Sequence, residues 1–117
     1  MELILITLIL IGLDILSGTI AAAMNGTLSS KVARQGLMHK SAYLLCICLA
    51  NVLDHAQTLI DLGLGINLQD LACYYVILCE TLSIVENIAK INPELRNTPL
   101  LKLFIGTHKD EEKGTEQ

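Results

Sequence analysis

The strongest constraint on the fold of this chain is the apolar stretch at its start, residues 3–24, in which Asp14 is the single charged side chain. A helix needs roughly 20 apolar residues to cross a hydrocarbon core of about 30 Å, so this stretch is long enough to span a bilayer. A cleavable signal peptide has a basic start and a shorter apolar run, whereas here Glu2 follows Met1. We therefore expect a membrane-spanning helix at this position.

Two later stretches are also long enough to span. Residues 41–61 begin as an apolar run and then become more polar, so this stretch is the weaker of the two. Residues 71–91 remain mostly apolar over their full length. The chain is therefore predicted to be an all-α integral membrane protein with transmembrane helices over about residues 3–24, 41–61 and 71–91.

The segments around these stretches suggest shorter structures. Residues 25–27 (Asn-Gly-Thr) predict a turn, and residues 62–70 form a glycine-bearing connection. Ser29 or Ser30 can cap a short interfacial helix over residues 31–40. A second short amphipathic stretch, residues 94–105, is interrupted by Pro99. We expect a membrane-embedded domain over residues 1–106 and a disordered polar tail over 107–117.

The basic residues are segregated along the chain, and this supports three crossings. With three crossings, the first connection lies on the same side of the membrane as the C-terminus. All eight Lys and Arg residues fall in these two regions, and none falls in residues 1–28 or 41–89. Basic residues favour the cytoplasmic side, so we expect the N-terminus outside and the C-terminus in the cytoplasm. We also expect Lys31, Arg34 and Lys40 to anchor the first connection at the lipid headgroups.

Each predicted span carries a polar stripe on one helix face, because its polar or small residues recur three or four positions apart. Acids at bilayer depth are costly and face protein or water. The stripes could pack on one another within a subunit, or line a wet lumen between subunits. We favour the lumen, since so short a chain has little surface with which to enclose its acids. The predicted pore-lining or subunit-pairing positions are Asp14, Ser17, Gly18, Asn51, Asp54, Glu80, Glu86 and Asn87.

Other classes of function find little support. The net charge of −4 argues against a nucleic-acid partner. The sequence has no glycine-rich phosphate loop, and His55 has no nucleophile in a readable motif. The four cysteines form no CxxC pair, so we expect them to be reduced and buried as small apolar side chains. We therefore predict no enzymatic activity, no cofactor and no metal.

Several short motifs, taken in order, resemble the phage-lysis and toxin-secretion holin family. The N-terminal motifs are residues 13–18 (LDILSG) and 28–32 (LSSKV), followed by Gly36. Later matches are Leu53-Asp54, residues 83–88 (SIVENI), and a tail bearing Pro93 and Pro99. The likeness covers about residues 10–105. It departs from the family where Lys90-Ile91-Asn92 replaces an expected glycine, and where the extreme tail is acidic.

The resemblance implies a small three-span holin in the cytoplasmic membrane of a bacterial host. Such a protein assembles with copies of itself, opens non-selective pores and releases an endolysin or a large toxin, which leads to host-cell lysis. Three alternatives stay open. The chain could be a small ion channel or transporter subunit, with Asp14 or Glu80 as an ion site. It could be an antiholin that delays a partner holin, or a soluble helical interaction module.

Overall fold

A computed structural model describes residues 1–99, which are helical apart from short connections and contain no strand. The four helices are α1 (Glu2–Met24), α2 (Ser30–Leu59), α3 (Leu68–Ile91) and the short 3-10 helix η1 (Pro93–Asn97). At 1.5 Å per residue, α1 and α3 are each about 35 Å long and α2 is about 45 Å long. The prediction of an all-helical chain with three helices long and apolar enough to cross a membrane is confirmed for these residues.

Local sequence signals set the helix boundaries. After α1, Gly26 adopts a φ of 67°, which glycine tolerates without strain, so the predicted turn is confirmed. Ser29 caps α2, because its Oγ accepts a hydrogen bond from the Val32 N–H at 3.2 Å. Asn67 caps α3 in the same way, with its Oδ1 3.0 Å from the Asp70 nitrogen.

One prediction about the first connection is wrong. Residues 31–40 do not form a separate interfacial helix, because α2 runs without a break from Ser30 to Leu59. The physical reason is that no proline interrupts this sequence, and residues 40–43 (Lys-Ser-Ala-Tyr) can all continue a helix. The second predicted amphipathic stretch holds η1 at its start. Residues 100–105 of that stretch and the predicted disordered tail lie outside the described residues.

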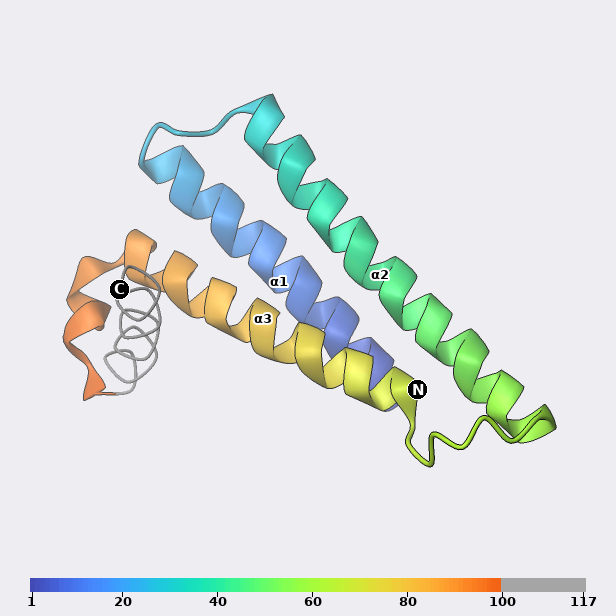
Figure 1. The fold of residues 1–117 in the computed structure, drawn as a ribbon. Coiled ribbons are helices and arrows are strands. Elements are labelled where there is room, and N and C mark those ends of the chain that lie inside the picture. The colour runs from blue at the N-terminus through green and yellow to red at the C-terminus, as the bar shows by residue number, and fades with distance from the viewer. Residues whose placement is uncertain (100–117) are drawn as a thin grey trace, which may run out of the picture.

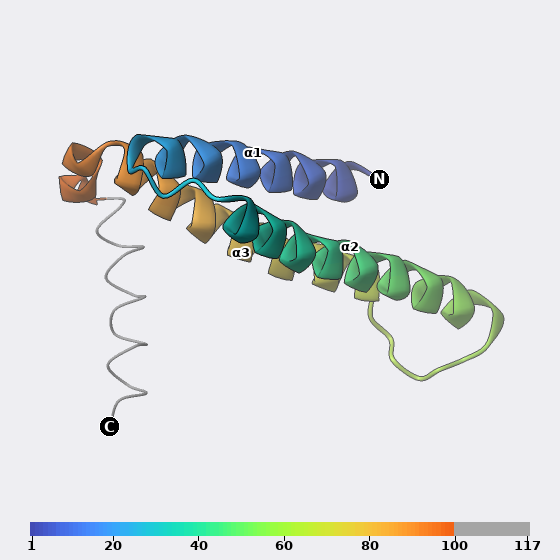
Figure 2. The ribbon, with the colours of Figure 1, turned by 90° about the horizontal axis from the view of Figure 1, so that it is seen from above.

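The helix α3 contacts both α1 and α2. Figures 1 and 2 show α1 and α3 running in the same general direction. The helix α2, which lies between them in the sequence, runs in the opposite direction. The N-terminus and the α2–α3 connection lie at one end of the molecule (Figure 1). The α1–α2 connection and η1 lie at the other end. The N-terminus and the second connection thus lie opposite the first connection and η1, as three successive crossings require.

The apolar core of the described chain is small. Its buried members are Ile11 of α1, Ile47 of α2, and Cys73 and Val76 of α3. In the most apolar part of each long helix, only 17%, 11% and 22% of the residues are buried, in chain order. The expectation of buried cysteines is wrong for Cys46 and Cys48, which lie exposed. These outward apolar surfaces do not suit a soluble module and fit three helices surrounded by lipid.

Candidate functional site: a charged cluster between three helices

Three charged side chains, one from each long helix, meet inside the molecule. The Lys40 Nζ lies 2.6 Å from Asp14 Oδ2 and 2.6 Å from Glu80 Oε2. The exposed fractions of these side chains are 12% for Lys40, 10% for Asp14 and 3% for Glu80. Charge-assisted hydrogen bonds of this kind are short and strong. The three helices are therefore joined at one point by a single ammonium group.

An amide and a hydroxyl extend this cluster along α1 and α3. The Asn87 Nδ2 donates to Asp14 Oδ1 at 2.9 Å and lies 3.0 Å from Ser17 Oγ. Ser17 Oγ in turn donates to the Asp14 backbone carbonyl at 3.2 Å. Gly18 lies beside this contact, and a Cβ at that position would be in van der Waals contact with Asn87 Nδ2, at 3.4 Å. The Asp14 carboxylate thus has partners on both α2 and α3.

The cluster lies at mid-length in two of the spans. Asp14 is the thirteenth residue of α1, and Glu80 is the thirteenth residue of α3. Where α1 and α3 cross a bilayer, these carboxylates lie near its centre. Unpaired charges there cost roughly 2.5–3.5 kcal/mol each on insertion scales, and more in other estimates. Pairing with Lys40 offsets much of that cost and leaves one negative charge uncompensated when all three groups are ionised.

A small cavity reaches the cluster from the end that carries the first connection. It has a volume of about 310 Å³, and its lining includes Gly18, Asn25, Asn87 and Lys90. Gly18 and Asn87 also belong to the surroundings of Asp14. The cavity lining is part polar and includes Asn87, whose amide binds Asp14.

A second polar site joins the end of α2 to the start of α3. The Asp54 carboxylate accepts hydrogen bonds from the backbone N–H groups of Leu68 at 2.8 Å and Gln69 at 2.7 Å. The Gln57 Nε2 donates to Asp54 Oδ1 at 3.1 Å, and the Asn51 amide donates to Gln69. An acid at this place satisfies free amides of the first turn of α3 and complements its helix dipole. These bonds close the α2–α3 hairpin at its connection.

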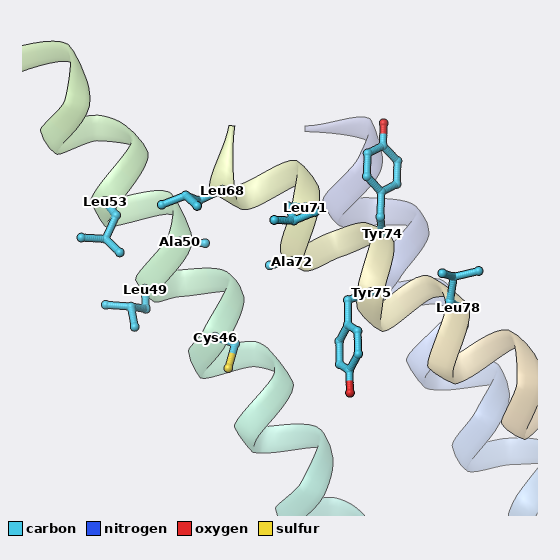
Figure 3. A pocket seen from close by; sticks show the side chains of 10 residues that line it. All are labelled: Cys46, Leu49, Ala50, Leu53, Leu68, Leu71, Ala72, Tyr74, Tyr75 and Leu78. Carbon is cyan, nitrogen blue, oxygen red and sulfur yellow. The ribbon is translucent and has the colours of Figure 1, made fainter. Parts of the chain in front are cut away.

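Between the two polar sites, α2 and α3 are separated by an open apolar groove of about 660 Å³. Its walls include Leu49 and Leu53 from α2, and Leu71, Tyr74 and Tyr75 from α3. Figure 3 shows these side chains, with the rings of Tyr74 and Tyr75 extending in opposite directions from α3. The groove means that α2 and α3 do not pack closely over this part of their length.

The structure divides the predicted polar positions into separate groups. Five of them belong to one cluster, in which Lys40 binds Asp14 and Glu80 while Asn87 binds Asp14 and Ser17 and lies beside Gly18. Asn51 and Asp54 belong to the second polar site, and Glu86 lies half-buried on α3. Within a single chain, the α1 and α3 stripes therefore pack on each other. Their predicted role in a pore or a subunit contact stays a prediction.

Sequence reasoning misses the role of Lys40. It predicts a place at the headgroups beside Lys31 and Arg34, which lie exposed near the start of α2. Instead, the Lys40 side chain binds two carboxylates of other helices. The available signal is the uninterrupted helix-forming sequence from Ser30 onward, which places Lys40 about three turns inside α2. The headgroup role of Lys31 and Arg34 stays a prediction.

Within residues 1–99, no group of three or more His, Cys, Asp and Glu side chains is arranged to hold a metal ion. The acids of the charged cluster are occupied by an ammonium group and an amide. The groups of this site thus link the three long helices by ion pairs and hydrogen bonds.

Comparison with known proteins identifies the family. The model of the bacteriophage holin family matches residues 1–105. The chain is also 29% identical to an uncharacterized protein of Listeria monocytogenes over 103 residues, which cover 86% of this chain and 70% of that protein. No solved structure matches the chain. With three apolar helices long enough to span a membrane and a family match over nearly its whole length, the chain belongs to the bacteriophage holin family.

Proposed function

We propose that this protein is a holin that assembles with copies of itself in the bacterial cytoplasmic membrane. The assembly forms non-selective pores through which an endolysin, or a large secreted protein, leaves the cell. The bacteriophage holin family is not an enzyme family, and the three apolar helices point to a multi-pass membrane protein. Membership of that family supports the general role, and the distribution of charge in the molecule supports the pore.

The observation that carries the proposal is the enclosure of charge within an apolar exterior. Asp14, Lys40 and Glu80 are largely buried, while many large apolar side chains are exposed on all three long helices. A dilute copy is then compatible with lipid on every side. The contacts between these charges are ion pairs, which can be exchanged. The same side chains can therefore bind new partners when copies of the chain meet. An aqueous lumen or a neighbouring copy can supply them.

The polar positions have defined roles in this proposal. They either line the lumen or pair one subunit with the next. These positions are Asp14, Ser17, Gly18, Asn51, Asp54, Glu80, Glu86 and Asn87. The orientation follows from charge, with the N-terminus outside and the C-terminus in the cytoplasm. The grouping of the α1–α2 connection with η1 at one end of the molecule is compatible with that orientation (Figure 1).

The test is induced expression of the whole chain in a bacterium, with and without a co-expressed endolysin. We expect growth to stop abruptly in both cultures, a cytoplasmic reporter enzyme to enter the periplasm, and lysis to follow only when endolysin is present. The exposed His39, next to Lys40 on α2, provides a matched control, and His39→Gln should release the reporter on the same schedule.

Other outcomes identify other functions. Ion flux that is selective and saturable, without passage of the reporter enzyme, would indicate a channel or transporter subunit. Delayed lysis on co-expression with an established holin, without lysis by this chain alone, would indicate an antiholin. Either result would overturn the proposal of a protein-conducting pore.

A further inference from the structure

We infer that copies of this chain assemble by exchanging α1, so that Asp14 of one copy binds Lys40 and Asn87 of the next. This inference rests on the proposed function and names the surface through which the copies join. The partner is a second copy of the chain. Its docking site is the α2–α3 hairpin, which carries Lys40, Glu80 and Asn87 on the side that faces α1.

The first argument is that the hairpin has its own polar connections, independent of α1. Asp54 on α2 binds the Leu68 and Gln69 amides at the start of α3. Gln57 donates to the Ile66 carbonyl in the connection at 3.3 Å, and Lys40 binds Glu80 at 2.6 Å. The hairpin is therefore fastened at its connection and again at the charged cluster. None of these bonds involves a residue of α1.

The second argument is that, in the described part of the chain, the polar contacts of α1 with the hairpin are concentrated in one turn. Asp14 binds Lys40 and Asn87, and Ser17 binds Asn87. The buried residues of α1 outside this turn are the apolar Ile11 and Ala21 and also Thr7, whose hydroxyl donates to the Leu3 carbonyl of the same helix. Apolar contacts can be replaced by lipid or by another helix at little free-energy difference, since lipid tails are as apolar as leucine. The polar part of the contact between α1 and the hairpin is thus made by Asp14 and Ser17, beside the apolar packing of α1 on α3.

The third argument concerns the connection between α1 and α2. It covers residues 25–29 and contains Gly26 at a φ of 67°. The hydroxyls of Thr27 and Ser29 bond to backbone atoms of positions close in sequence, Ala22 and Val32. An extended connection of five residues reaches about 17 Å, enough to carry α1 from its own hairpin to an adjacent one. Exchange of α1 requires a change in this single connection.

The fourth argument is energetic. Asp14 cannot be left facing lipid, so the cluster opens at low cost only if an identical set of partners is offered at once. A second copy offers that set with the same geometry, which is the usual basis of domain swapping. Each hairpin then receives one α1 and each copy donates one α1. Such a head-to-tail contact propagates from copy to copy and closes into a ring when the rotation allows, and a ring is what a pore requires.

The test uses two charge-altered chains. Asp14→Lys alone gives a cluster with two cations and one acid, and Lys40→Asp alone gives three acids and no cation. We expect each variant alone to lose reporter release. When the two are co-expressed and the variants alternate in the assembly, an exchanged α1 restores one cation and two acids to each cluster. The α1 of the D14K chain brings its new ammonium to the K40D hairpin, and the α1 of the K40D chain brings its native carboxylate to the D14K hairpin. We therefore expect the mixture to regain release.

Controls separate exchange from other causes. A chain with both D14K and K40D has the native number of charges within one copy and should release the reporter alone. In a further control, E2Q, a change at an exposed residue, replaces K40D as the co-expressed chain. The mixture of D14K and E2Q should give no more release than the same amount of E2Q gives alone. If the double variant is active while the D14K and K40D mixture is inactive, the clusters form only within single chains and the inference is overturned.

A second measurement leaves the charges intact. Ile11 of α1 and Cys73 of α3 belong to the same apolar core. One tagged chain carries Ile11→Cys with its four native cysteines replaced by alanine, and a differently tagged chain keeps Cys73 as its single cysteine. During release we expect an oxidative cross-link between the two tags. The outward-facing Ile9→Cys is the matched control and should not cross-link to Cys73.

The outcomes are distinguishable from failure of the proposed function. Release by the wild-type chain, with no cross-link between the two tagged chains but a cross-link inside a third chain that carries both I11C and Cys73, would overturn the exchange of α1 and leave the holin role intact. Absence of release by the wild-type chain would overturn the holin role and this inference with it.

Discussion

Asn87 and Asp14 are 73 positions apart in the sequence, and the Asn87 amide donates to the Asp14 carboxylate at 2.9 Å. The contact joins the middle of α1 to the last third of α3. It brings together two residues that each look, in isolation, like an unexplained polar group in an apolar helix. Lys40 binds the same carboxylate from α2. The polar residues of the three long helices therefore contact one another within the chain.

Removing the Asn87 amide should weaken this contact. Asn87→Leu deprives Asp14 and Ser17 of a donor, and loss of a buried hydrogen-bond partner costs about 1–3 kcal/mol. We expect the variant in detergent to lose its helicity at a lower SDS concentration than the wild type does. Far-UV circular dichroism measures this loss. The exposed Asn97→Leu is the control and should unfold with the wild type. Equal stability of both variants would contradict the role of Asn87.

The two glycines of α1 should respond differently to a large side chain. A Cβ at Gly18 would lie 3.4 Å from Asn87 Nδ2, whereas Gly12 has nothing within 4 Å. Gly18→Leu should therefore force α1 and α3 apart, at a cost of about 1–3 kcal/mol typical of overpacking. Gly12→Leu should be neutral or stabilising, because leucine favours a helix more than glycine does. The same SDS titration compares them, and an equal loss of stability would show that Gly18 has no special contact.

Removing the cation should be worse than removing one acid. Lys40→Leu leaves two facing acids without a cation, and breaking a buried ion pair costs about 3–5 kcal/mol. Asp14→Leu leaves Lys40 paired with Glu80, so this variant should still insert and should change the timing of lysis. Membrane accumulation, measured by immunoblotting, and lysis curves test both variants. A lysis curve of Asp14→Leu identical to that of the wild type would remove Asp14 from the mechanism.

The Asp54 site should control the start of α3. Asp54→Ala exposes the Leu68 and Gln69 amides, and loss of such a cap costs about 0.5–2 kcal/mol. We expect hydrogen exchange at these two amides to accelerate about 2- to 30-fold, since each 1.4 kcal/mol corresponds to a factor of ten. Asp61→Ala removes an acid that contacts the Gly63 amide in the exposed connection. Exchange at the start of α3 should be unchanged in that control.

The three-crossing topology can be tested by labelling. In a chain without native cysteines, Thr27→Cys lies in the first connection and Leu64→Cys in the second. Three crossings place these connections on opposite sides of the membrane, with the second outside. A membrane-impermeant thiol reagent applied to intact spheroplasts should label Leu64→Cys and not Thr27→Cys until the membrane is permeabilised. Labelling of both positions before permeabilisation and before release begins would contradict this topology.

The class of this protein could be read from its amino-acid sequence. Helix length, apolar character, the turn at Gly26 and the Ser29 cap depend on residues that are neighbours in the chain. The polar stripes were also visible, because helical periodicity places residues three and four positions apart on one face. The break expected near Lys40 was wrong, because local sequence limits a helix only weakly where no proline occurs.

The partners of the buried charges, in contrast, emerged from the packing of the helices. Lys40 could have reached the headgroups from a short helix, but a continuous α2 and the contacts of α3 with both other helices bring its ammonium to Asp14 and Glu80. Such pairing depends on the relative rotation and depth of three helices, and local propensity carries no information about either. The sequence therefore defined which side chains needed partners, and the arrangement of α1, α2 and α3 selected them.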